Sequence, residues 1–192
     1  IPRRRYTTHE NALFSIAINM HTEIQLRIDR LQASKQVMEA TIAAAGCDPH
    51  RAPQGEWSIA QVLEHLLASE GGTLGYMKKK SSGGWDSLEV AAAEHNEKSA
   101  AIHARLESNE RYKAPDVLPE PTNAIALEEL LNRWNSLRND LINFASIIPS
   151  EHFDKLVFRQ PVAGMLTALQ ALDFMDAHLR HHLPQIERIR LS

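Results

Sequence analysis

Two histidines near the C-terminus have the spacing of a metal-binding pair. His178 and His182 lie four residues apart in a segment of helical periodicity, so their side chains share one face of the predicted helix. Imidazoles at this spacing, with Cβ atoms roughly 5–6 Å apart, can bind one metal ion together. A third ligand must come from another segment, and His65 is the best candidate. The sequence therefore predicts a three-histidine metal site between two helices.

Such a site would have the chemistry of a catalytic metal centre. Three neutral imidazoles leave the full charge on a divalent ion and keep a fourth position open for water or substrate, which is typical of catalytic rather than structural zinc. Water at that position could reach a pKa of about 7, and a thiol would be deprotonated. Zinc, nickel, copper and iron all accept imidazole ligands, so the residues alone do not select the metal.

The same histidines have ordinary structural interpretations. His65 falls about 60° from Val62 on a helical wheel, at the flank of an apolar stripe, where a lone histidine is more often a hydrogen-bonded core or surface residue. His181 points about 100° away from its neighbour His182. We therefore interpret His181 as solvent-facing or pocket-lining and not as a ligand.

Two carboxylates occur among apolar positions of the predicted helices. Glu70 falls within a leucine stripe, and Asp176 lies among the leucines of the last helix. A buried carboxylate is costly unless paired, so each could orient a metal-site histidine, although an interhelical ion pair explains Glu70 at least as well. Both residues, with His181, are candidate pocket or supporting residues. Trp57 and Gln185 are interpreted as structural, and no catalytic residue is assigned.

Other catalytic classes find little support in the sequence. Cys47 is the only cysteine and has no flanking nucleophile motif, and no G-x-S-x-G motif or phosphate-binding glycine loop is found. A single cysteine excludes an intramolecular disulfide, which is compatible with a reducing compartment and favours the cytoplasm.

The elements that must position these residues are predicted to be helices. Helical periodicity covers about 22–45, 58–79, 87–108, 125–148 and 167–190, and the third of these segments has the weakest apolar stripe. Three helix starts have a hydroxyl residue followed three positions later by glutamine, a capping signal, at Thr22/Gln25, Ser58/Gln61 and Thr167/Gln170. Residues 154–161 are predicted to be extended.

These elements predict an all-α fold, a four-helix bundle with an extra N-terminal segment. Residues 1–21 would form an arm or short helix, and residues 22–192 the bundle domain. An apolar patch in the first segment, Leu13, Phe14, Ile16 and Ile18, should not stay in water. We expect it to pack on the bundle or on a second subunit, and favour a homodimer.

Composition excludes several partners. A chain of 192 residues with 43% hydrophobic and 23% charged residues fits one globular domain. Its net charge of −3 lacks the basic footprint of a nucleic-acid binder. No apolar run approaches the roughly 20 residues of a membrane span, and the Arg3–Arg5 cluster precedes no uninterrupted hydrophobic region. We therefore expect neither nucleic acid, membrane anchor nor export signal.

Three motifs together resemble the DinB-like superfamily. They are GEWSIAQVLEHL at 55–66, GMLTALQ at 164–170 and HLRHHLPQ at 178–185, and the resemblance covers roughly 22–189. It implies a four-helix bundle with a divalent metal, nickel or zinc, on three histidines that map by motif onto His65, His178 and His182. His181 departs from the pattern, because similar proteins commonly carry arginine there.

The resemblance implies a range of activities. Similar proteins include S-transferases that use bacillithiol or mycothiol, a mycothiol-dependent isomerase and many proteins without known activity. The function expected is a metal-dependent enzyme, a thiol-dependent S-transferase or hydrolase acting on a small electrophilic molecule with a low-molecular-weight thiol as co-substrate. The alternative is a non-catalytic metal- or ligand-binding stress-response protein, since no unmistakable general base lies beside the ligands.

Overall fold

The computed structural model of the chain describes residues 20–108 and 118–191. Its helices are α2 (Thr22–Ala43), α3 (Ile59–Ser81), α4 (Ala93–Glu107), α5 (Leu127–Ser146) and α6 (Ala168–Leu191), with short 3₁₀ turns η1 (Trp85–Ser87) and η2 (Ser150–His152). A small sheet consists of β1 (Leu156–Gln160) and β2 (Gly164–Thr167). The predicted apolar patch at 13–18 lies outside the described residues.

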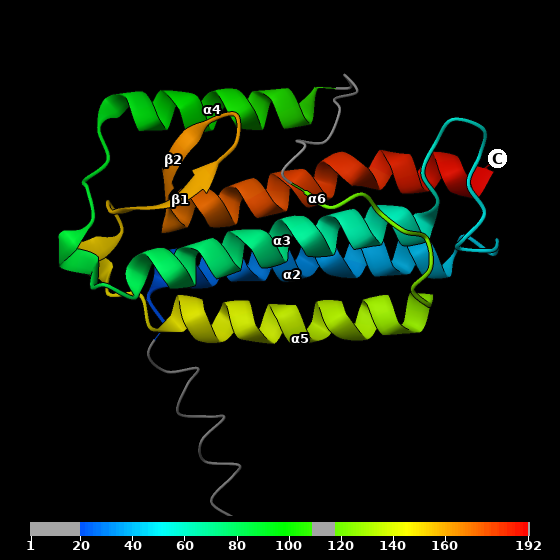
Figure 1. Cartoon of the computed structure of the whole chain (residues 1–192), viewed down its shortest axis with the longest axis horizontal. Helices are drawn as coiled ribbons and strands as arrows, with labels where there is room; N and C mark the ends of the chain where they lie inside the picture. Colours follow the sequence, from blue (N-terminus) through cyan, green and yellow to red (C-terminus); the bar gives the residue numbers. More distant parts are fainter. Residues whose placement is uncertain (1–19, 109–117, 192) are drawn as a thin grey trace, which may run out of the picture.

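Four of the helices form the bundle. Helices α2, α3, α5 and α6 run side by side along the long axis, while α4 lies on the far side of α6 beside the β1–β2 hairpin (Figure 1). This arrangement confirms the predicted all-α four-helix bundle. Within the ranges that the structure describes, no helix is long and apolar enough to cross a membrane.

The segment before α4 differs from the prediction. A helix was expected from residue 87, but α4 begins at Ala93. The preceding backbone pairs instead with the approach to β1: the Ala91 amide donates to the Asp154 carbonyl at 2.7 Å, and the Leu156 amide donates to the Glu89 carbonyl at 2.8 Å. The prediction of helix over 87–92 was therefore wrong, because contacts with a segment distant in sequence outweigh the helix propensity of the alanines.

The expected extended segment is a β-hairpin that leads directly into α6. Strands β1 and β2 pair antiparallel, with Gln160 opposite Gly164 at the closed end. Gly164 has φ 78°, a left-handed conformation that glycine adopts at little cost. The Gln160 side-chain oxygen accepts hydrogen bonds from the amides of Val162 and Ala163 and so orders the turn. The hairpin is thereby held at one end of the site-bearing helix.

Two of the three predicted capping signals are confirmed. Ser58 and Gln61 exchange side-chain to backbone hydrogen bonds at the start of α3, and Thr167 and Gln170 do the same before α6. The signal at Thr22 was wrong, because the preceding residue is the cap: the His21 imidazole accepts a hydrogen bond from the Glu23 amide. Capping hydrogen bonds thus define the first residues of α3 and α6, the two helices that carry the candidate ligands.

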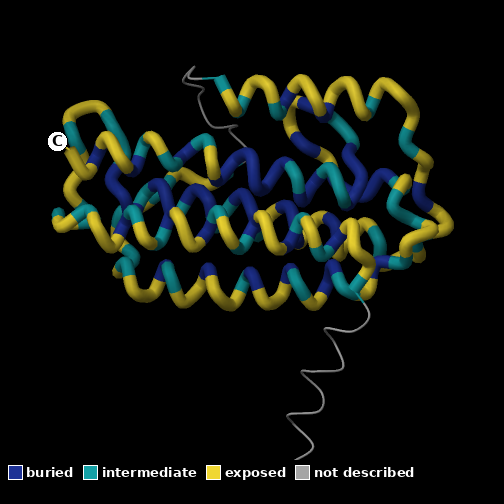
Figure 2. Tube along the Cα trace, turned by 180° about the vertical axis from the view of Figure 1, so that it is seen from behind, coloured by how far each residue is buried: buried dark blue, intermediate teal, exposed yellow. Residues whose placement is uncertain are grey.

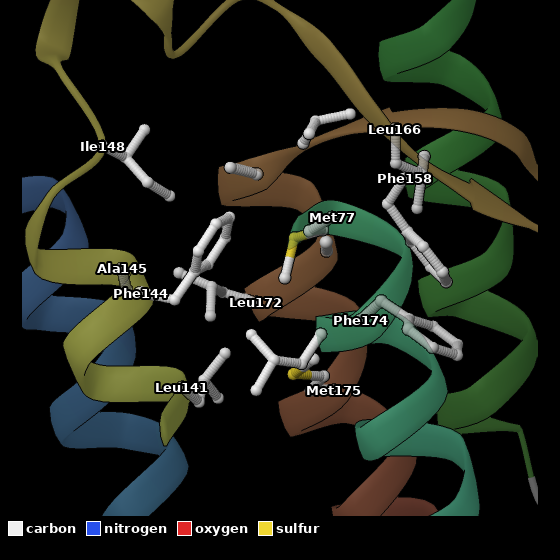
Figure 3. Packing of buried hydrophobic residues seen from close by; sticks show 14 of the residues in the cluster. Met77, Leu141, Phe144, Ala145, Ile148, Phe158, Leu166, Leu172, Phe174 and Met175 are labelled. Atoms are coloured by element: carbon white, nitrogen blue, oxygen red, sulfur yellow. The ribbon is translucent and has the colours of Figure 1, made fainter. Parts of the chain in front are cut away.

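Buried apolar residues form two clusters along the bundle, on the inward faces of the helices (Figure 2). The first cluster is built from the hairpin and adjacent helix ends, and Figure 3 shows Met77, Phe144, Leu172 and Phe174 within it. The second surrounds Trp134, which is fully buried.

A layer of buried polar residues separates the two clusters. Along α6 the first cluster ends at Met175 and the second begins at Leu179, with His178 between them. Along α3, Glu70 lies between Leu66 of the second cluster and Leu74 of the first. The candidate site therefore belongs to a polar layer that crosses an otherwise apolar bundle.

Candidate metal centre

The three predicted histidines converge in the folded chain. His65 comes from α3, and His178 and His182 come from successive turns of α6; all three are buried. His178 Nε2 lies 3.1 Å from His65 Nε2 and 3.2 Å from His182 Nε2. One ring nitrogen from each residue lies within 4.8 Å of the other two. Residues separated by more than 100 positions thus form one nitrogen-rich cluster.

The spacing of these nitrogens fits a metal ion. With Zn–N bonds of about 2.0–2.1 Å, tetrahedral geometry holds two ligand nitrogens about 3.3 Å apart. An octahedral ion with similar bond lengths would hold them about 3.0 Å apart. The observed separations of 3.1 and 3.2 Å fall between these values. The cluster can therefore accommodate either geometry with small adjustments of the rings.

Hydrogen bonding prepares His182 for such a role. Its Nδ1 lies 2.8 Å from Gln185 Oε1, an acceptor, so Nδ1 carries the proton. A neutral ring then has its lone pair on Nε2, which faces His178. His178 Nε2 has a nitrogen neighbour on two sides, and one proton can satisfy only one of these contacts. A cation bound by all three lone pairs would satisfy the whole cluster.

Burial keeps the three rings neutral. Desolvation lowers the pKa of His65 to about 4, and the nearby charge of His181 acts in the same direction. Desolvation, followed by the charge of His65, lowers the pKa of His182 to about 3 despite the opposing hydrogen bond to Gln185. The pKa of His178 is also lowered, first by burial and then by His182 and His65. At neutral pH the rings have the unprotonated state that metal ligation requires.

A cavity of about 260 Å³ opens beside the cluster. Helices α3, α4 and α6 and the β1–β2 hairpin contribute its walls, and all three histidines line it. Much of the remaining lining is apolar or aromatic, including Trp57, Tyr76, Ile102, Leu106, Phe158 and Phe174. The Phe174 ring stacks on the His178 ring at a centroid distance of 5.6 Å. A small molecule in this cavity would reach the nitrogen cluster.

His181 lies in the cavity wall and outside the convergent cluster. Its Nδ1 lies 2.7 Å from the Leu106 carbonyl oxygen, which links α6 to the end of α4. Its ring packs edge-on against His182 at 5.2 Å. His181 is therefore a residue of the cavity wall, and a solvent-facing position was the other interpretation from the sequence.

The two candidate supporting carboxylates have other partners. Glu70 accepts hydrogen bonds from Arg138 Nη2 at 2.6 Å and from Trp134 Nε1 at 3.0 Å, both on α5. It is therefore part of an interhelical ion pair, the alternative interpretation from sequence, and burial raises its pKa while Arg138 opposes this shift. Asp176 accepts from Ser34 on α2 and from Arg180. The Glu70 bonds and the Ser34–Asp176 bond connect helices, whereas the Arg180–Asp176 bond lies within α6, and none of them involves the three histidines.

Two residues near the site were interpreted only as structural. Gln185 contacts His182 directly, and the three-residue spacing on one helix face was the available signal. Trp57 packs in the second cluster as expected of a residue at a helix start, but it also lines the cavity. Its ring lies 5.1 Å from that of His65. No sequence feature distinguished this second role, because it depends on where α6 lies.

Comparisons with known proteins agree with this architecture. The model of the DinB superfamily matches residues 48–186, which include all three histidines. An uncharacterized protein of Bacillus subtilis (strain 168), YuaE, is 26% identical over 135 residues, covering 70% of this chain and 78% of that protein. No solved structure gives a significant match.

Proposed function

The chain belongs to the DinB superfamily, and we propose that it holds one divalent metal ion, zinc or nickel, on His65, His178 and His182. The observation that carries this proposal is the convergence of three buried ring nitrogens, 3.1 and 3.2 Å apart, on the wall of a cavity. Gln185 would hold the His182 ring in the tautomer that presents Nε2 to the ion.

The proposed activity is that of a metal-dependent enzyme, a thiol-dependent S-transferase or a hydrolase acting on a small electrophilic molecule. A divalent ion on three neutral imidazoles supplies a Lewis acid with an open position, where the pKa of a thiol or water is lowered. A low-molecular-weight thiol is the proposed co-substrate. In the transferase reaction the thiol would lose its proton to solvent, its sulfur would bond to an electrophilic carbon, and the leaving group would depart from that carbon with its electron pair.

The chain's own residues would position the reactants and exclude water. Phe174 packs against His178, and Trp57 packs against His65, so aromatic rings surround the nitrogen cluster on two sides. Such walls limit water access and increase the strength of the electrostatic interactions within the site. The Leu106 carbonyl holds His181 in the wall, where its ring would contact a bound molecule.

A second function has a specific observation in its favour. Among the described residues that line the cavity there is no aspartate or glutamate to act as a general base. A protein that binds a metal and a small ligand without turnover, in a stress response, would need no such group.

Screening of metal-loaded protein would distinguish the two functions. Purified protein would be assayed with low-molecular-weight thiols and a panel of electrophiles, with and without chelator. Turnover that is lost with chelator and in His178→Ala, but retained in the surface control Arg133→Met on α5, would support the enzyme. Saturable, metal-dependent ligand binding without turnover would support the second function. Absence of metal binding would refute both.

A further inference from the structure

One buried hydroxyl in the cavity wall has no hydrogen-bond partner among the described residues. It belongs to Ser69, which lies one turn after His65 on α3, and both residues line the cavity. Only 8% of Ser69 is exposed, yet within the described ranges its side chain takes part in no hydrogen bond. Buried hydroxyls in native proteins are normally hydrogen-bonded. This one is therefore available to a molecule in the cavity.

The next hydroxyl along the helix is already paired. Thr73 also lines the cavity, but its Oγ1 donates to the Ser69 carbonyl at 2.8 Å, the backward bond that is common for a hydroxyl within a helix. Ser69 makes no equivalent bond to the carbonyl of His65. Ser69 is also not among the described residues with a side-chain atom that is both unpaired and sealed from solvent. Its oxygen is thus accessible from the cavity.

The direction of the Ser69 side chain is set by the helix. Side chains of an α-helix point back toward its N-terminus and cover the preceding turn. For Ser69 that turn holds His65, whose Nε2 lies 3.1 Å from His178 Nε2. Residues four positions apart on a helix have Cβ atoms about 5–6 Å apart. We therefore expect the hydroxyl to reach an atom that binds beside the three histidines.

A serine hydroxyl at this position suits a sulfur that changes its charge. It has one O–H donor and two acceptor lone pairs, and it rotates to suit its partner. It can accept from the S–H of a thiol and donate to the thiolate after the proton has left for solvent. A hydrogen bond to the charged form favours that form. The apolar walls of Phe158 and Phe174 limit water in the cavity and so strengthen this interaction.

We infer that Ser69 is a catalytic residue of the proposed transferase, and that its hydroxyl donates a hydrogen bond to the sulfur of the bound thiolate. This inference rests on the proposed function, because it requires a thiol at the site of the three histidines. Ser69 has no part in holding the metal. Removal of the hydroxyl should therefore weaken thiolate binding and leave both metal binding and the apolar contacts unchanged.

Cobalt-loaded protein provides the assay, because a thiolate bound to cobalt gives a charge-transfer absorption. Phenylmethanethiol would be titrated at neutral pH into the wild type and Ser69→Ala. We expect the variant to bind the thiolate roughly 10-fold more weakly, the effect of one hydrogen bond to a charged group. Ethylbenzene has a similar shape and no sulfur, so it should bind both proteins equally in ligand-observed NMR with zinc-loaded protein. The cobalt content of the variant should equal that of the wild type.

Two further variants serve as controls. Thr73→Val removes a cavity-wall hydroxyl whose proton is already donated to the Ser69 carbonyl, so its affinity for the thiolate should stay near that of the wild type. Ser136→Ala makes the same chemical change on the exposed face of α5, where the Ser136 hydroxyl donates to the Asn132 carbonyl. It should have no effect, and circular dichroism would verify that every variant is folded.

The outcomes separate this inference from the proposed function. If the wild type binds cobalt but gives no thiolate absorption, or if Ser69→Ala binds the thiolate as tightly as the wild type, this inference is overturned and the metal site stands. Equal weakening in Thr73→Val, weaker binding of ethylbenzene by Ser69→Ala, or loss of cobalt from that variant would also overturn it, because the role of Ser69 would then be structural. A wild type that binds no cobalt refutes the proposed function, and this inference with it.

Discussion

Acidification should destabilise the metal-free protein over a defined pH interval. A histidine in the unfolded chain titrates near pH 6.5, whereas burial holds the pKa of His65 at about 4 in the folded state. Between these values the unfolded chain binds a proton that the folded chain does not, so stability rises with pH. The contribution of the neutral ring is complete above about pH 6.5 and is lost as the pH falls toward 4.

The size of the effect follows from the pKa difference. A difference of about 2.5 between 6.5 and 4 corresponds to about 3 kcal/mol for His65, at 1.36 kcal/mol per pH unit. His182, with a pKa of about 3, and His178 act in the same direction. Their effects do not simply add, because the rings interact within one site. Even the single contribution is a large part of the roughly 5–15 kcal/mol that stabilises a typical domain.

Urea unfolding provides the assay. Chelator-treated protein would be unfolded at pH values from 7 to 4.5, with far-ultraviolet circular dichroism as the signal. We expect the free energy of unfolding to fall with decreasing pH and, in His65→Gln, to fall less steeply by up to about 1.4 kcal/mol per pH unit, the value for one proton. A wild-type free energy that is constant over this interval, or one that changes in parallel with that of His65→Gln, would refute the assignment of a buried neutral ring.

Three further perturbations test the site and its surroundings. Gln185→Leu should weaken zinc binding about 10- to 100-fold in competition with a chromophoric chelator, because His182 loses its acceptor, whereas Gln36→Leu on the exposed face of α2 should have no effect. Arg138→Met should lower the free energy of urea unfolding by about 3–5 kcal/mol by leaving the Glu70 carboxylate buried and unpaired, and adding Glu70→Leu should recover much of this loss. Chelation should lower the melting temperature, since zinc at about a thousand times its dissociation constant adds roughly 4 kcal/mol to the folded state; identical melting curves would contradict a specific site.

Strong periodicity made the bundle predictable. The spacing of Leu130, Trp134 and Leu141 marked one face of a helix, and all three side chains are buried in α5. The start of α4 was not predictable in this way. Its preceding residues are a local run of alanines with good helix propensity, but their backbone hydrogen bonds go to residues 154–156, more than 60 positions away. The residues next to α4 in the sequence therefore do not predict this backbone pairing.

In the candidate site, too, the features that depend on nearby residues were predictable from the sequence, and those that depend on helix packing were not. The four-residue spacing of His178 and His182 is local, and it predicted the shared face on α6. The position of His65 beside them depends on how α3 packs on α6, which the motif resemblance implied and the spacing did not. The partner of Glu70 also required the fold, because Arg138 lies 68 positions away on α5. A carboxylate in an apolar stripe signals a buried partner without identifying it.

Elemental analysis of protein purified without chelator tests the central claim most directly. The wild type should carry one divalent metal ion per chain, and His178→Ala and His182→Ala should lose most of it while circular dichroism shows a folded bundle. His181→Ala should keep a metal content near that of the wild type, because its ring lies outside the convergent cluster. Full occupancy in both ligand variants, or an equal loss in His181→Ala, would contradict the three-histidine site.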